Sequence, residues 1–180
     1  MTMSDRPDTV AGMTEIKDAR VDPPQTGGER EQLEAWLDYH RETLLLKCAG
    51  LDEALLKTRS CPPSSLSLLG LLRHMTDVEN GWFSDFIGEY RPRYHGPDNR
   101  DGDFDDLDSV PVAEVFDVFR AECDRSRAAA ARHGLDDTYT DERDRIFSLR
   151  WLYLHMIEEY ARHNGHADLL RERIDGVTGD

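Results

Sequence analysis

Four side chains that can bind protons or metal ions recur at helical spacing in one late segment of the chain. They are His155, Glu159, His163 and His166, and the segment that holds them, residues 148–171, contains no proline. Glu159 and His163 are four residues apart, so in a helix their side chains project from the same face. Imidazole and carboxylate groups are common ligands of zinc. The spacing therefore favours a metal site or a catalytic site in this segment.

The same segment carries an apolar stripe, made of Leu149, Leu152, Tyr153, Met156, Tyr160, Ala167 and Leu170. At about 100° per residue, with Leu152 as zero, the stripe covers roughly 0 to +100°. The candidate ligands fall in or beside it, at about +20° for His163, about −20° for Glu159, about −40° for His166 and about −60° for His155. An unpaired polar group there would cost about 1 to 3 kcal/mol. Either a divalent metal satisfies these groups, or they pair with arginines and with one another.

Two further histidines lie on predicted helices. His74 stands on the flank of an apolar line, and Asp77, three residues later, could hold its second ring nitrogen or could be surface charge. His40 lies on the apolar face of an earlier helix. It could join a metal site, but a packed histidine with one hydrogen bond is the simpler interpretation.

Apolar periodicity predicts four long helices and no strands. They are expected over about residues 29–48, 66–88, 109–133 and 148–171, with Ser109 and Ser148 as caps, and with a polar connection from 135 to 146. Four such helices bury their stripes most simply as an all-α four-helix bundle. The connection between the second and third helices, residues 89–110, is long enough to let those two run parallel. Its aspartates suggest calcium, but the glutamate that ends an EF-hand loop is absent.

Length and composition narrow the class of protein. A chain of 180 residues suits one domain, expected at residues 29–176, after a polar and disordered tail over residues 1–28. The formal net charge of −15 argues against nucleic acid or an anionic membrane as a partner. Three cysteines without C-x-x-C spacing argue against a disulfide framework or a zinc knuckle. With no apolar run of membrane-spanning length and no signal peptide, we expect a cytoplasmic protein.

Two stretches of the sequence, residues 67–82 and 159–172, resemble the signature regions of the DinB superfamily of YfiT-like metalloenzymes, and specifically its branch long catalogued as a domain of unknown function. The resemblance covers residues 29–174. It implies a bundle with an up-down-down-up course and a divalent metal held by one side chain of the second helix and two of the fourth. The matching positions are His74, Glu159 and His163.

Many members of the superfamily have His-x3-His where this chain has Glu159 and His163. The metal ligands of the related mycothiol-dependent maleylpyruvate isomerases look like a His, Glu, His set, so the glutamate is compatible with metal binding. Whether His155 or His166 adds a further ligand is left open by the resemblance. Zinc is the favoured metal, and nickel and iron also suit these ligands.

Two imidazoles and one carboxylate leave a tetrahedral metal with one open position. A thiol bound there loses its proton far below its usual pKa of about 8.5. Because superfamily members are often thiol transferases that use mycothiol, bacillithiol or glutathione, the expected reaction is attack of a small thiol on a small electrophile. Arg91 and Arg93 could hold an anionic cofactor group, although solvated charge is the simpler account.

Two alternatives to a thiol transferase remain. One is a metal-dependent hydrolase with Asp77 or His166 as the base. The other is a non-catalytic bundle that binds a metal or small molecule, or that assembles as a homodimer.

Overall fold

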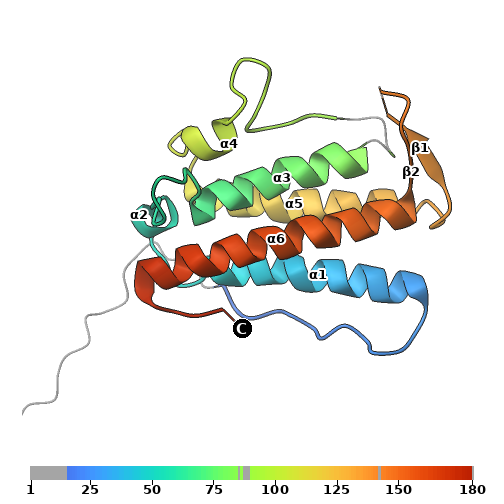
Figure 1. Cartoon of the computed structure of the whole chain (residues 1–180), viewed down its shortest axis with the longest axis horizontal. Helices are drawn as coiled ribbons and strands as arrows, with labels where there is room; N and C mark the ends of the chain where they lie inside the picture. The colour runs from blue at the N-terminus through green and yellow to red at the C-terminus, as the bar shows by residue number, and fades with distance from the viewer. Residues whose placement is uncertain (1–15, 85, 87–89, 142, 180) are drawn as a thin grey trace, which may run out of the picture.

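The protein is described here from a computed structural model, which places residues 16–84, 86, 90–141 and 143–179 (Figure 1). Its elements in chain order are α1 (Glu29–Lys47), α2 (Glu53–Leu56), α3 (Leu68–Ser84), α4 (Gly102–Asp105), α5 (Val112–Ala130), β1 (Thr138–Thr140), β2 (Ile146–Ser148) and α6 (Leu149–Asp175). The four long helices α1, α3, α5 and α6 form the predicted all-α four-helix bundle.

The four long helices run up, down, down and up. In Figure 1, α1 and α6 run from right to left, whereas α3 and α5 run from left to right. The main packing partners are the two parallel pairs, α3 with α5 and α1 with α6. The segment between α3 and α5, residues 90–111, returns along the bundle and allows these two helices to run parallel, as the long connection predicted. We call this segment the crossover.

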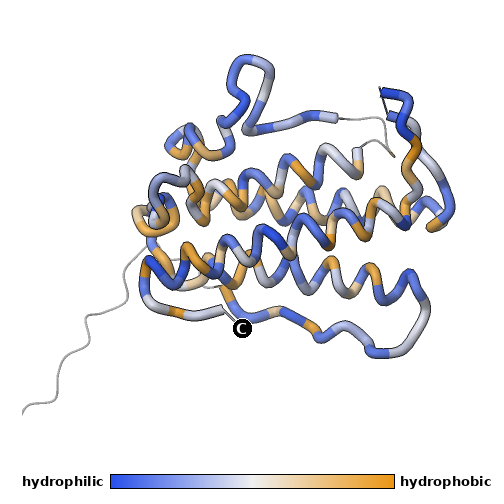
Figure 2. Tube along the Cα trace, in the orientation of Figure 1, coloured by the Kyte–Doolittle hydropathy of each residue, from blue (hydrophilic) through white to orange (hydrophobic). Residues whose placement is uncertain are grey.

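The core is built from the apolar stripes of the four helices, which Figure 2 shows as orange residues recurring along each helix. Its fully buried members include Leu37 and Leu44 of α1, Leu71 and Met75 of α3, Phe116 and Phe119 of α5, and Leu152 and Met156 of α6. Burying one such side chain stabilises the fold by about 1.5–3 kcal/mol. The apolar periodicity of the sequence therefore predicts which faces of the four helices pack against one another.

The helix ends are partly as predicted. Ser148 caps α6, because its hydroxyl accepts a hydrogen bond from the backbone N–H of Trp151. Gly176, with a φ of 79°, ends α6 after Asp175, four residues beyond the predicted end. Ser109 does not cap α5: Pro111 holds that position, and the Ser109 hydroxyl donates to the carbonyl of Asp106 instead. The predicted end of the second helix, at residue 88, lies outside the described residues.

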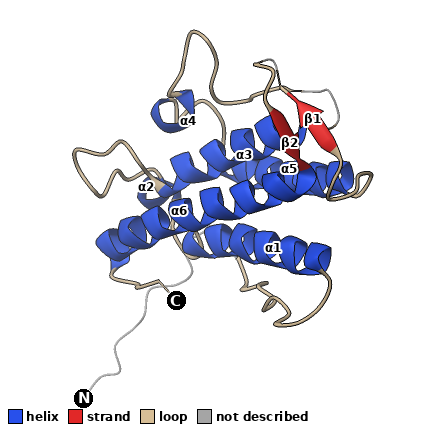
Figure 3. Ribbon diagram, turned by 45° about the vertical axis from the view of Figure 1, so that its right-hand side comes forward, coloured by secondary structure: helices blue, strands red, loops and turns tan. Residues whose placement is uncertain are grey.

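The expectation that the chain has no strands was wrong. β1 and β2 form an antiparallel hairpin in which Tyr139 pairs with Phe147 (Figure 3). Each strand has three residues, too few for a recognisable alternation. The hairpin lies where α6 begins, and Phe147 contacts Trp82 of α3 with ring centroids 5.7 Å apart. The short helices α2 and α4 were also missed.

The segment before α1 was predicted as part of a mobile tail. From residue 16 to residue 28 it forms neither helix nor strand, and Ile16 packs against the apolar core. The predicted domain boundary at residue 28 stays a prediction. Within the described part of the chain, no helix is both long enough and apolar enough to cross a membrane.

A buried polar network joins the helices inside the core. Glu79 of α3 is fully buried and accepts two hydrogen bonds of 2.7 Å from the guanidinium of Arg41 in α1. The hydroxyl of Tyr160 in α6 donates to the same carboxylate at 2.8 Å. Burial and the Glu79 charge raise the pKa of Tyr160 well above its usual range, so this hydroxyl remains a donor. The thiol of Cys123 in α5 also lies 4.0 Å from this carboxylate, so all four long helices meet at Glu79.

Candidate metal centre

His74 and His163 lie in contact across the junction of α3 and α6. Their ring centroids are 4.8 Å apart, with the ring planes inclined at 58°. The other neighbour of the His74 ring is Phe104, at 5.2 Å between centroids. Two of the three predicted ligands, although 89 positions apart in the sequence (163 minus 74), therefore face each other on neighbouring helices.

Glu159, the third predicted ligand, stands beside His163 on α6. Its Oε2 atom is 3.5 Å from Nε2 of His163, and its Oε1 atom is 3.3 Å from the guanidinium of Arg162. Glu159 and His163 are largely shielded from solvent, with side-chain exposures of 16% and 12%. The i, i+4 spacing read from the sequence thus places both side chains on one face.

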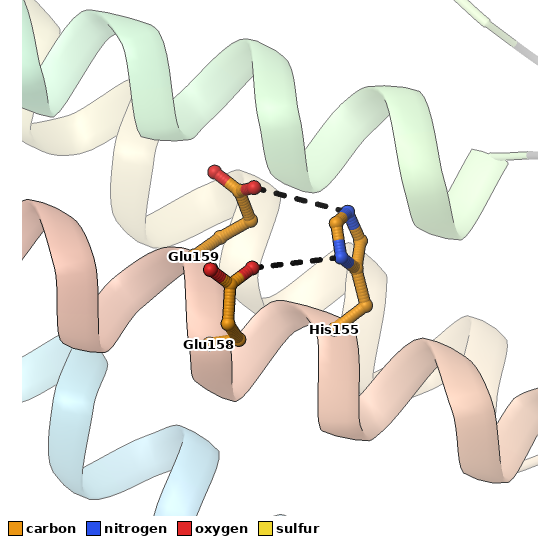
Figure 4. A group of neighbouring side chains, drawn as sticks. All are labelled: His155, Glu158 and Glu159. Carbon is orange, nitrogen blue, oxygen red and sulfur yellow. Dashed lines mark ion pairs between the residues drawn. The ribbon is translucent and has the colours of Figure 1, made fainter.

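A tighter group lies one turn nearer the start of α6. His155, Glu158 and Glu159 offer ligand atoms that all lie within 4.8 Å of one another (Figure 4), and among the described residues this is the group of three that meets that criterion. Its ion pairs are long, at 3.8 Å from His155 to Glu158 and 4.0 Å to Glu159. The predicted ligands His74, Glu159 and His163 do not meet this criterion as a set. His163 contacts both of the others.

Aromatic rings hold His155. It stacks on Trp151, with centroids 4.8 Å apart and planes at 18°, and it meets Trp82 edge-on at 4.5 Å. Glu158 is half-exposed and pairs with Arg162. His166 contacts the proposed centre differently, with its Nδ1 atom 3.4 Å from Nδ1 of His163. His155 thus borders Glu159, and His166 borders His163.

Asp103, from the crossover, orients His74. Its Oδ2 atom lies 2.7 Å from Nδ1 of His74, and its side chain is only 5% exposed. This bond leaves Nε2 of His74 as the nitrogen available to a metal, an arrangement in which metal-binding histidines are usually held. Asp103 follows Gly102, where any side chain would overlap the carbonyl oxygen of Tyr94. The close approach of two backbone segments therefore fixes the place of Asp103.

Asp77 neither supports His74 nor is surface charge, so both interpretations of this residue were wrong. Asp77 is buried and accepts hydrogen bonds from the backbone N–H groups of Arg93 and Tyr94, both at 2.8 Å. It also accepts one from the backbone of His95 at 3.1 Å and pairs with the His95 ring at 2.8 Å. Asp77 therefore anchors the crossover on α3, and both of its carboxylate oxygens accept hydrogen bonds from it.

His40 is a packed histidine. The side-chain amide of Asn164 lies 3.4 Å from its Nδ1 atom and donates to its backbone carbonyl at 3.1 Å. Burial lowers its pKa. Its ring also contacts Trp36, with centroids 6.0 Å apart. The simpler of the two interpretations of this residue is confirmed.

The environment of His163 keeps its imidazole neutral. Burial lowers the pKa of His163 to about 4, and the neighbouring His74, His166 and Arg162 add to the shift, while Asp103 opposes it. A neutral imidazole has a free lone pair, which is the form that binds a metal. Together with the nearby carboxylate of Glu159 and the oriented ring of His74, the donor set fits a divalent metal.

This lowered pKa predicts a loss of stability in acid. The unfolded chain takes up a proton at His163 below its ordinary pKa of 6.5, whereas the folded chain does so only near 4. The stability that depends on a neutral His163 is therefore complete above pH 6.5 and is lost as the pH falls toward 4. Between pH 7 and pH 5 we expect a loss of about 2 kcal/mol in the free energy of unfolding, measured in urea. In His163→Gln this component should vanish; equal pH dependence in both proteins would contradict the assignment.

A cavity of about 720 Å³ opens beside His74, between α3, the crossover and the β1–β2 hairpin. Its walls include Val78 and Trp82 of α3, Tyr90, His95 and Phe104 from the chain before α5, and Tyr139 and Phe147 of the hairpin. This volume is typical of sites for small molecules. Arg91 and Arg93, which were considered for anion binding, do not line it; their backbone N–H groups anchor the crossover to Asn80 and Asp77.

The buried cysteines of the chain are unsuited to act as the nucleophile. Burial raises the pKa of Cys48 to about 12, and burial and the Glu79 charge raise that of Cys123 further. Cys61 lies elsewhere, with its thiol 4.0 Å from the carbonyl of Leu169 near the end of α6. A thiol nucleophile in the cavity would have to come from a bound molecule.

The bundle course and the histidines facing each other across α3 and α6 agree with the DinB superfamily that the sequence resembles. Comparison with protein families matches residues 32–176 to the mycothiol-S-transferases. The chain therefore belongs to the mycothiol-S-transferase family. Comparisons with curated proteins and with solved structures found no match.

Proposed function

We propose that this protein is a divalent-metal-dependent S-transferase that joins a small thiol, mycothiol in the first place, to a small electrophile. The observation that carries the proposal is the contact between His74 and His163, with Glu159 next to His163 and a cavity beside His74. Membership of the mycothiol-S-transferase family supports the choice of thiol. His74, Glu159 and His163 are the proposed ligands, and His155 and His166 lie close enough to replace or assist one of them.

A divalent metal bound by these side chains would lower the pKa of a thiol and so supply a thiolate at neutral pH. Zinc suits two imidazoles and a carboxylate, as do nickel and iron. The residues of the chain have separate tasks. Asp103 holds the tautomer and the direction of the His74 ring. Trp82 and Phe147 give the cavity apolar surface against which a substrate can pack.

The test is metal analysis followed by thiol turnover. Protein purified without a nickel column should contain about one equivalent of divalent metal per chain. It should consume mycothiol with an electrophile such as monobromobimane, and it should lose this activity after chelation and regain it with zinc. Absence of both metal and turnover with mycothiol, bacillithiol and glutathione would reject the proposal.

Among the alternatives, a hydrolase has less support. Of its two candidate bases, Asp77 is occupied by the crossover, which leaves His166. Hydrolysis of an ester and amide panel without added thiol would favour this alternative over thiol transfer. A non-catalytic bundle would instead retain its full stability after chelation and yield no metal on analysis.

Asp103→Asn is expected to weaken metal binding by about 10–100-fold, because an amide cannot fix the His74 ring as a carboxylate does. Asp105→Asn is the matched control. It lies in the same short helix, but its side chain is 56% exposed and pairs with Arg59. Zinc affinity, measured against a competing chromophoric chelator, should fall only in the first variant. Equal affinities would show that Asp103 does not act through His74.

A further inference from the structure

Charged side chains of both signs line the cavity beside His74, among them four aspartates. Three arginines line it, Arg100 from the crossover and Arg143 and Arg145 from the hairpin. Arg145 is paired with Asp141 at 2.7 Å. The guanidinium groups of Arg100 and Arg143 make no hydrogen bond or ion pair with any residue that the structure describes. Arg100 and Arg143 are both exposed, so their guanidinium groups are open to a ligand in the cavity.

The acidic residues of the cavity are mostly occupied elsewhere. Asp77 pairs with His95, Asp103 with His74, and Asp141 with Arg145. Asp101 is the remaining carboxylate in the lining. Among the described lining residues, the free groups are thus two guanidinium groups and one carboxylate. The two histidines neutralise Asp103 and Asp77 only when protonated, so the preference for an anion is local to the two free guanidinium groups, which match the planar geometry of a carboxylate.

Much of the remaining wall is aromatic. Trp82 and Phe147 meet edge to face at 5.7 Å, and Tyr139 pairs with Phe147 across the hairpin. Arg145 lies over the Phe147 ring at 5.1 Å, which fixes the ring from the side of the hairpin. Such surfaces bind planar hydrophobic groups by stacking or edge contacts. The anion that fits has an aromatic body as well as a negative charge.

We propose that this cavity binds an aromatic carboxylate, with its acid group at Arg100 and Arg143 and its ring against Trp82 and Phe147. His74 lines the same cavity, so a molecule held there lies beside the proposed metal centre. As a statement about the electrophilic substrate, this inference rests on the proposed function. Binding itself needs neither thiol nor turnover and can be tested separately.

The experiment compares two ligands of nearly equal shape. Calorimetric titration of the full-length protein, as purified, uses naphthalene-2-carboxylate and its uncharged amide. We expect the acid to bind about tenfold more tightly than the amide, and Arg100→Gln/Arg143→Gln to remove this preference. Arg132→Gln is the control, because Arg132 is exposed at the end of α5 and does not line the cavity. Far-ultraviolet circular dichroism checks that each variant is folded.

A second pair of ligands identifies which substrate carries the acid. N-acetylcysteine and its amide differ by the same charge, but they are models of the thiol substrate and not of the electrophile. A charge preference for the naphthalene pair alone supports an acidic electrophile, whereas a preference for the thiol pair alone overturns that assignment. Equal binding of naphthoate and its amide, no binding of either, or a preference that survives the double substitution overturns the proposal. None of these results depends on whether mycothiol is turned over, so the two proposals can fail independently.

Discussion

Replacement of His163 by alanine is expected to lower the metal affinity of the protein by about a hundredfold or more, and thiol transfer with it. His163 is the residue through which the proposed ligands are connected. It contacts His74 of α3 at 4.8 Å between ring centroids and Glu159 at 3.5 Å. Without it, one imidazole and one carboxylate remain on different helices. Elemental analysis and zinc titration measure the effect directly.

His133→Ala is the control for this prediction. His133 lies just after α5, where it pairs with Asp137 at 3.4 Å and packs against Phe86. Its removal should leave the metal content unchanged. Because the low pKa of His163 destabilises the fold in acid, His163→Ala should lose less unfolding free energy between pH 7 and pH 5 than the unmodified protein does. That result would show that the variant is folded. Equal metal content in both variants would remove the proposed site.

Glu79→Ala is expected to reduce the free energy of unfolding by about 3–5 kcal/mol. Glu79 is fully buried and receives hydrogen bonds from Arg41 and Tyr160. Its loss removes from Arg41, whose side chain is 3% exposed, the buried carboxylate that accepts two of its hydrogen bonds, and leaves it the half-exposed carboxylate of Asp38 at 2.8 Å. A domain of this size has a total stability of about 5–15 kcal/mol, so the variant should be close to unfolding.

Urea unfolding measures this loss, with Glu114→Ala as the control. Glu114 is exposed in the first turn of α5, and its removal should change stability by less than about 0.5 kcal/mol. Arg41→Met/Glu79→Leu removes both charges and should recover most of the loss, because an apolar pair of similar volume does not need the compensation. Similar unfolding midpoints for Glu79→Ala and Glu114→Ala would mean that the buried pair contributes little.

Most of the bundle follows from periodicity. The stripe through Leu152, Met156 and Tyr160 runs along α6, and the cap at Ser148 marks where the helix begins. The hairpin could not be predicted in the same way, because its three-residue strands are held by Trp82 and Phe147 packing against each other. Periodicity also gives no account of Glu79, which lies in the core because Arg41 is opposite it.

The candidate site was predictable only where it lies on helices. The spacing of Glu159 and His163 indicates a shared face whatever the tertiary structure, whereas the position of Asp103 depends on the path of an irregular segment. In sequence, Asp103 is one of several aspartates in a polar run, and Asp77 is the nearer neighbour of His74. The fold reverses these roles, since Asp77 is used to anchor the crossover.

The crossover joins two parallel helices, yet it also supplies Asp103, Arg100 and Phe104 to the cavity wall. Its anchors on α3 include Asn80 and Asp77 on one side of residues 96–101 and, on the other side, Arg73, whose guanidinium donates to the carbonyls of Gly102 and Asp106. Substitutions, insertions or grafts between these anchors can therefore alter what the protein recognises while the four packed helices keep their interior intact. A library confined to residues 96–101 would vary ligand preference at little cost in folding, which makes this bundle a scaffold whose selectivity can be exchanged independently of its architecture.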